Sequence, residues 1–142
     1  MSERFTGFTE GRIAIMDGAM GTMIQLYGLE EKDFRDPAFG DVKTELKGNN
    51  ECLNFTHPEI IAEIHHEYID AGAEIIETNS FSANRISQKE YGLEAFAYEM
   101  AYKAARIARK AADEEMAKTS RKIYVAGSVG PTSKSLTLAP DI

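Results

Sequence analysis

Cysteine is nearly absent from this sequence, which has a single one among its 142 residues. That residue, Cys52, has no partner for an intrachain disulfide, so a small secreted scaffold held by disulfides is excluded. The amino-terminal stretch also lacks the apolar segment that follows the basic start of a signal peptide. Both absences indicate a cytoplasmic protein.

Long apolar runs and clusters of basic residues are missing as well. No stretch reaches the roughly 18 apolar residues that a membrane-spanning helix needs, so the sequence predicts no membrane partner. Its 16 basic residues are scattered among 23 acidic ones, which gives a net charge of −7. Because a nucleic-acid-binding protein would present a basic patch or stripe, nucleic acid is not an expected partner either.

The overall composition is that of an ordinary folded domain. Hydrophobic residues make up 43% and charged residues 27% of the chain, enough for one core. We predict a flexible lead-in over residues 1–11 and one folded unit over residues 12–142.

Three short apolar segments each run into polar or glycine residues. Residues 12–16 are followed by Asp17, residues 74–78 by Asn79, and residues 123–126 by a glycine-rich loop. Helical patterns separate these segments, so we expect three parallel strands that are neighbours in chain order. The sequence therefore predicts an α/β fold with a binding site at the carboxyl ends of its strands.

The connecting segments carry helix and loop signals. Thr56 and Glu59 fit a capping box at the start of one helix, and a longer helix is expected over residues 93–116. Residues 29–51 predict a long polar loop. Such a loop is either functional or a surface excursion.

Asp17 is the strongest candidate for ligand binding. It ends a predicted buried strand, and Gly18 after it lets backbone N–H groups come close to a ligand. A carboxylate beside free amides suits a zwitterionic amino acid. Alternatively, Asp17 caps the following helix, with its carboxylate accepting the N–H of Met20 or Gly21.

Five further residues are candidates in the other loops. Asn49 and Asn50 offer amide donors and acceptors, although both also suit tight turns. Thr78 and Asn79 end the second strand, where they either line the site or cap backbone groups. Gly130 allows a close approach of the third loop.

The sequence predicts no metal site. His65 and His66 are adjacent, so they face about 100° apart on a helix and do not converge easily on one ion. Cys52 and His57 form a single pair. Structural zinc takes four ligands and catalytic zinc three, and the sequence offers no such set.

Four motifs, in order along the chain, carry a resemblance to a known family. They are DGAMGTM, LKGNNE, AGAEIIETNSFSANR and VAGSVGPT. Together they resemble the amino-terminal homocysteine-binding domain of cobalamin-dependent methionine synthases, within the homocysteine S-methyltransferase family. The resemblance implies a parallel (β/α)₈ barrel of TIM type. Such a barrel takes roughly 250 residues, so only about the first three βα units are expected here, in a truncated chain.

The resemblance also implies a substrate and its ligands. The matching aspartate, Asp17, would contact the amino group of homocysteine. The substrate-binding set that we expect in this chain is Asp17, Gly18, Asn49, Asn50, Thr78, Asn79 and Gly130. No catalytic residue is expected in it.

The resemblance further implies two cofactors for the full enzyme. A methyl group would pass from methylcobalamin, regenerated from methyltetrahydrofolate, to the zinc-activated thiol of homocysteine, which gives methionine. Three cysteines on later strands would hold zinc, and folate and cobalamin domains of the same polypeptide would be partners. Because these parts are missing here, we expect the chain alone to bind no zinc and to be inactive.

Two alternatives stay open. A cobalamin-independent homocysteine or thiol S-methyltransferase would take its methyl group from a small molecule. The chain would otherwise be a non-catalytic, self-associating α/β fragment.

We expect the isolated chain to self-associate. Part of a barrel exposes a strand edge on each side, and pairing of these edges between copies would cover them. Sedimentation velocity should therefore show dimers or larger species. A monodisperse monomer that unfolds cooperatively would contradict this expectation.

Overall fold

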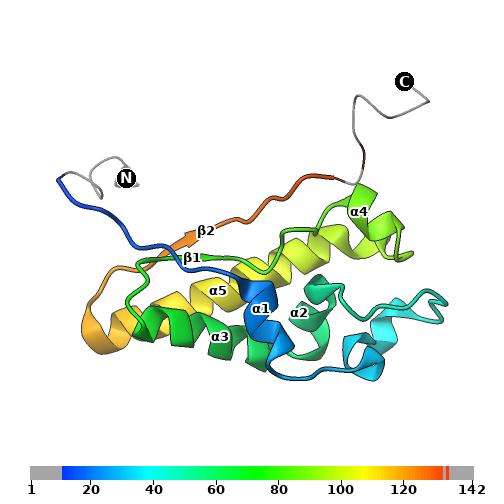
Figure 1. Ribbon diagram of the computed structural model, residues 1–142, viewed down its shortest axis with the longest axis horizontal. Helices are drawn as coiled ribbons and strands as arrows, with labels where there is room; N and C mark the ends of the chain where they lie inside the picture. Colours follow the sequence, from blue (N-terminus) through cyan, green and yellow to red (C-terminus); the bar gives the residue numbers. More distant parts are fainter. Residues whose placement is uncertain (1–10, 133, 135–142) are drawn as a thin grey trace.

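The structure is a computed structural model that describes residues 11–132 and residue 134. The predicted lead-in, apart from Gly11, lies outside the described residues, as do residues 135–142. The described helices are α1 Met20–Gln25, α2 Leu53–Thr56, α3 Pro58–Asp70, α4 Arg85–Lys89 and α5 Ala97–Thr119, and the strands are β1 Ile75–Glu77 and β2 Tyr124–Ala126 (Figure 1). Four 3₁₀ turns complete them: η2 Glu31–Phe34, η3 Pro37–Phe39, η4 Asn50–Cys52 and η5 Glu94–Phe96.

Three segments run parallel in one small sheet. β1 pairs in parallel with β2, with Ile75 opposite Tyr124 at the start of the ladder. On the other side of β1, Met16 forms a parallel bridge with Ile75. The predicted parallel order of the three segments is confirmed, while the eight-stranded barrel goes beyond these elements and stays a prediction.

The first predicted strand is much shorter than expected. Residues 12–16 were expected to pair along their length, but regular pairing is limited to the bridge at Met16. The carbonyl of Ile15 accepts the N–H groups of Glu74 at 2.8 Å and Ile75 at 3.2 Å. Ile13 is 90% exposed, so no burial stabilises an extended conformation farther back.

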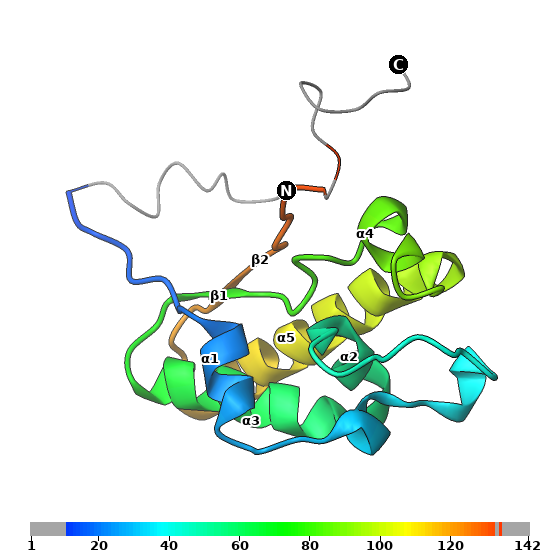
Figure 2. The ribbon, with the colours of Figure 1, turned by 45° about the vertical axis from the view of Figure 1, so that its right-hand side comes forward.

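α3 and α5 cover one face of this sheet (Figure 2). Ile76 of β1 and Ile123 pack there against Ile69 of α3. The face of α5 that joins them is built of alanines, which let a helix approach a sheet closely: Ala108, Ala111 and Ala112. None of the described helices is long and apolar enough to cross a membrane.

The long segment between α1 and α2 is an ordered part of the core. Its turns bury Phe34, Phe39 and Leu46. Phe39 meets Phe55 and Phe96 edge to face, with both pairs of ring centroids 5.1 Å apart. The interpretation of residues 29–51 as a surface excursion is therefore wrong. Their apolar residues are spaced too irregularly to be recognised as core from periodicity.

The predicted capping box is also wrong. His57, not Thr56, is the N-cap of α3, and the Thr56 hydroxyl donates instead to the carbonyl of Cys52 at 3.3 Å. Glu59 contacts the imidazole of His57 at 2.9 Å. Pro58 explains the difference, because proline disfavours the helical conformation of the residue before it. His57 is accordingly non-helical and separates α2 from α3. The longest helix, α5, begins at Ala97 and runs to Thr119, somewhat later than predicted.

His65 generates a stability prediction. Its side chain is fully buried, and neither ring nitrogen has a hydrogen-bond partner among the described residues. Burial lowers the pKa of His65 to about 4, so the neutral ring is favoured in the folded state. The unfolded ring binds a proton near its ordinary pKa, so stability should be lost as the pH falls below about 6.5.

We expect His65→Leu to remove this acid sensitivity. Between pH 7 and pH 4.5 the wild-type chain should lose roughly 2–3 kcal/mol more unfolding free energy than the variant. Urea unfolding at both pH values measures the difference. His66→Gln, on the same helix but half-buried, serves as the matched control. Equal losses in wild type and His65→Leu would contradict the prediction.

Candidate functional site

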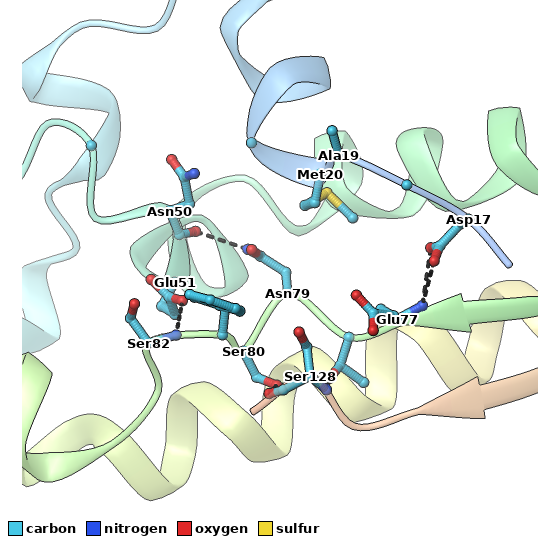
Figure 3. A pocket seen from close by; sticks show the side chains of 15 residues that line it. Asp17, Ala19, Met20, Asn50, Glu51, Glu77, Asn79, Ser80, Ser82 and Ser128 are labelled. Atoms are coloured by element: carbon cyan, nitrogen blue, oxygen red, sulfur yellow. Dashed lines mark hydrogen bonds between the residues drawn. The ribbon is translucent and has the colours of Figure 1, made fainter. Parts of the chain in front are cut away.

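A cavity of about 470 Å³ lies at the carboxyl ends of the three parallel segments (Figure 3). Its walls come from the turn into α1, from η4 and from the loops after β1 and β2. The lining residues are Asp17, Gly18, Ala19, Met20, Gly21, Gly48, Asn50, Glu51, Glu77, Thr78, Asn79, Ser80, Phe81, Ser82 and Ser128. Five of the seven predicted site residues are among them: Asp17, Gly18, Asn50, Thr78 and Asn79.

Asp17 binds the backbone of the neighbouring strand. Its two carboxylate oxygens accept the N–H of Glu77, at 3.0 and 2.9 Å. The N-cap of α1 is Ala19, without a side-chain cap, so the interpretation of Asp17 as a helix cap is wrong. The carboxylate is engaged by the Glu77 N–H at the end of the adjacent strand, and the N-cap of α1 lies two residues farther along the chain.

The environment of Asp17 favours its neutral form more than water does. Burial raises the pKa of Asp17 to about 6, and the nearby charge of Glu77 adds to the rise, while the hydrogen bond from the Glu77 N–H opposes it. Above pH 6 the group is a partly desolvated carboxylate. A bound cation stabilises such a carboxylate more than it stabilises a carboxylate exposed to water.

The cavity is anionic as a whole. Three carboxylates line it, those of Asp17, Glu51 and Glu77, and no lysine, arginine or histidine is among the lining residues. Glu51 is buried, and its carboxylate accepts the N–H of Ser82 at 2.6 Å. Burial raises the pKa of Glu51. Sequence reasoning missed Glu51, although its place directly after the two asparagines of the LKGNNE motif was a signal.

Hydroxyl groups join the loops after β1 and β2. Thr78 and Ser80 share a hydrogen bond of 2.7 Å between their side-chain oxygens. The Thr78 hydroxyl also accepts the N–H of Ser128 at 3.0 Å, and the Ser80 hydroxyl donates to the Ser128 carbonyl at 2.9 Å. Thr78 therefore fixes the two loops to each other at the edge of the cavity.

Asn79 ties the cavity wall to η4. Its side-chain amide donates to the carbonyl of Asn50 at 2.8 Å and to the Asn54 side chain at 3.2 Å. Asn54 in turn donates to the carbonyl of Asn79 at 2.9 Å. The Asn50 carboxamide lies beside Gly21, where a Cβ atom would stand 3.4 Å from its nitrogen. A side chain at position 21 would therefore be in contact with Asn50.

Asn49 and Gly130 do not line the cavity. The Asn49 carboxamide forms a reciprocal pair with Gln88, at 2.8 and 3.0 Å, and both side chains are buried. Gly130 donates its N–H to the carbonyl of Phe81 at 2.9 Å. A Cβ atom at position 130 would lie 2.5 Å from the Phe81 ring, so glycine permits this close contact of the two loops.

The described residues do not fit zinc. Residues 11–132 and 134 contain no group of three or more His, Cys, Asp or Glu side chains placed to hold a metal ion. Cys52 is fully buried, and burial raises the pKa of its thiol to about 12, so it is not a ready thiolate ligand. We therefore assign no metal-dependent step to these residues.

The Asn49–Gln88 pair generates a second prediction about stability. Asn49→Leu should lower the unfolding free energy by about 1–3 kcal/mol, because it leaves the side-chain oxygen of Gln88 buried without a donor, while the Gln88 nitrogen keeps the Ser82 carbonyl. Replacing both residues with leucine should cost less than the sum of the two single changes. Urea unfolding of a double-mutant cycle measures the coupling. Strictly additive effects would show that the pair does not act as a unit.

Comparisons with known proteins identify the family of the chain. The family described as Homocysteine S-methyltransferase matches residues 14–141. The metallated form of the homocysteine methyltransferase MmuM from Escherichia coli is similar in structure, with a TM-score of 0.66 and 28% identity over 88% of this chain and 40% of that one. Its oxidised form gives a TM-score of 0.63 and 30% identity over 84% and 37%. The chain thus spans about two fifths of the length of this relative, and it belongs to the homocysteine S-methyltransferase family.

Proposed function

We propose that the cavity binds the amino-acid part of homocysteine and that the chain contributes this wall to a homocysteine S-methyltransferase. The observation that carries the proposal is the partly desolvated carboxylate of Asp17 in an anionic cavity. Family membership supports the choice of substrate. Residues 12–142 would then be the amino-terminal part of a (β/α)₈ barrel.

The zwitterionic end of homocysteine fits the polarity of the cavity. Its ammonium group would pair with Asp17, whose oxygens keep lone pairs beyond those used by the Glu77 N–H. Its carboxylate would meet neutral donors, the Asn50 carboxamide and the N–H of Gly18, because no cationic side chain lines the cavity. Thr78 and Asn79 would hold these groups in place rather than react.

The wider activity that we propose is that of cobalamin-dependent methionine synthase. The four sequence motifs support it, in particular LKGNNE and VAGSVGPT. Methylcobalamin would be the methyl donor, zinc would activate the thiol, and the residues for both would lie outside the described ones. Folate and cobalamin domains of the same polypeptide would be the partners.

A second candidate differs in its methyl donor. The similarity to the homocysteine methyltransferase MmuM supports methyl transfer to homocysteine in general. A cobalamin-independent member of the family would take its methyl group from a small molecule. The complete protein, supplied with homocysteine and either methylcobalamin or a small methylated donor, distinguishes the two. Methionine formed with methylcobalamin supports the first, and methionine formed with the small donor alone supports the second.

Asp17→Asn should weaken homocysteine binding in the complete protein. The loss of a charge-assisted hydrogen bond of about 1.5–3 kcal/mol corresponds to a roughly tenfold to hundredfold rise in Kd. Asparagine keeps an oxygen for the Glu77 N–H, so the fold should change little. Calorimetric titration at pH 7.5 measures the affinity. The matched control is Glu74→Gln, which removes a negative charge that pairs with Arg12 outside the cavity.

The same carboxylate predicts a pH dependence of homocysteine binding. Because the pKa of Asp17 is about 6, the carboxylate should take up a proton and release the ammonium as the pH falls from 7 to 5. Homocysteine affinity should therefore drop over this range in the wild type and stay nearly flat in Asp17→Asn. Titrations at pH 7, 6 and 5 measure it. A parallel drop in both proteins would remove Asp17 from the site.

A further inference from the structure

The loop after β1 is held from both sides at Ser82. The Glu51 carboxylate accepts the Ser82 N–H at 2.6 Å, and the Gln88 side chain donates to the Ser82 carbonyl at 3.1 Å. Gln88 is itself fixed by its buried pair with Asn49. The backbone at Ser82 is thereby attached to η4 and to α4 at once, as Figure 3 shows for the Glu51 side.

Glu51 is an energetically unfavourable residue at this buried position. Its side chain is 5% exposed, and no lysine, arginine or histidine pairs with it among the described residues. An uncompensated buried carboxylate destabilises a fold unless its hydrogen bonds make up the difference. The short bond to Ser82 is of the charge-assisted kind, which is stronger than a bond between neutral groups.

This bond joins two of the segments that line the cavity. Glu51 lies on η4 next to Asn50, and Ser82 lies in the loop that follows β1, two residues after Ser80. The bond from Asn79 to the Asn50 carbonyl, 2.8 Å long, joins the same walls at the end of β1. The two bonds together set the distance between η4 and the loop that follows β1.

We propose that Glu51 is a positioning residue for the amino-acid site, which keeps the η4 wall and the β1 loop at the separation that the substrate requires. This rests on the proposed function, because the substrate is taken to bind in the cavity that these walls help to form. Glu51 acts through Ser82 and does not touch the ligand. Losing its hydrogen bond should therefore widen the cavity, while losing its charge alone should matter less.

Two variants separate position from charge. Glu51→Gln keeps an oxygen that accepts the Ser82 N–H, whereas Glu51→Leu keeps the size and removes the acceptor. We expect Glu51→Leu to weaken homocysteine binding about tenfold or more and Glu51→Gln to stay within about threefold of wild type. The Ser82 amide should exchange its hydrogen faster in Glu51→Leu alone. Equal weakening by both variants, or by neither, overturns the proposal.

A titration gives a readout that general destabilisation would not produce. The Ser82 amide resonance of the 142-residue chain should titrate with Glu51, at a pKa above the ordinary 4.5. The other titratable groups near Glu51, the thiol of Cys52 and the hydroxyl of Tyr91, have raised pKa values and keep their protons below pH 8. Asp17 and Glu77 are the other carboxyl groups among the described residues that line the cavity.

The expected pattern identifies the residue responsible. The inflection of the Ser82 resonance should vanish in Glu51→Gln and persist in Asp17→Asn. An inflection that persists in Glu51→Gln overturns the role of Glu51. Wild-type protein that binds no homocysteine would instead overturn the proposed function, and the Ser82 titration and exchange would still decide whether Glu51 holds the loop.

Discussion

The site depends on one hydrogen bond of a β-ladder, in which a side-chain carboxylate is the acceptor in place of a backbone carbonyl. Along the first segment the ladder runs from the Ile75 N–H to the carbonyl of Ile15, and from the Asp17 N–H to the carbonyl of Ile75. The next bond of a parallel ladder would join the Glu77 N–H to the backbone carbonyl of Asp17. The Asp17 carboxylate accepts that N–H instead. The backbone is thus released to turn at Gly18 into α1, and the cavity opens where the ladder stops.

The position of Asp17 at the end of the ladder also explains why the cavity is anionic. An acid that ends a strand is partly desolvated by the elements that meet there, and the polar tip of β1 brings Glu77 beside it. Glu51 adds a third carboxylate from η4. The cost of these charges is offset by neutral hydrogen bonds elsewhere, among buried amides such as the Asn49–Gln88 and Asn54–Asn79 pairs. The hydrogen bonds among these buried amides hold the cavity walls rigid. The negative charge of the carboxylates has no cationic side chain to pair with in the cavity, so a cationic group of a ligand can pair with it.

The sequence predicted the parts of this arrangement that depend on local pattern. Apolar runs ending in Asp17 and Asn79 marked the carboxyl ends of parallel strands, because side-chain polarity changes there within two residues. The pattern could not show that Asn49 turns into the core, since the partner that satisfies its amide, Gln88, is 39 residues away. Nor could it show that residues 29–51 are core, because the aromatic partners of Phe39, Phe55 and Phe96, lie far from it in the sequence. Glu51 was missed for the same reason. Whether an acidic residue is buried depends on the elements packed around it, and those are distant in the sequence.

Charge at the site also connects folding to binding. Desolvated carboxylates such as those of Asp17 and Glu51 make the empty cavity less stable than an uncharged one of the same shape would be. A ligand that brings an ammonium group binds the folded state alone, so it stabilises that state by mass action. It also lowers the pKa of the carboxylate that it contacts, because an opposite charge favours ionisation. Binding should therefore release protons near pH 6, because the Asp17 carboxyl group is more fully ionised when the site is filled.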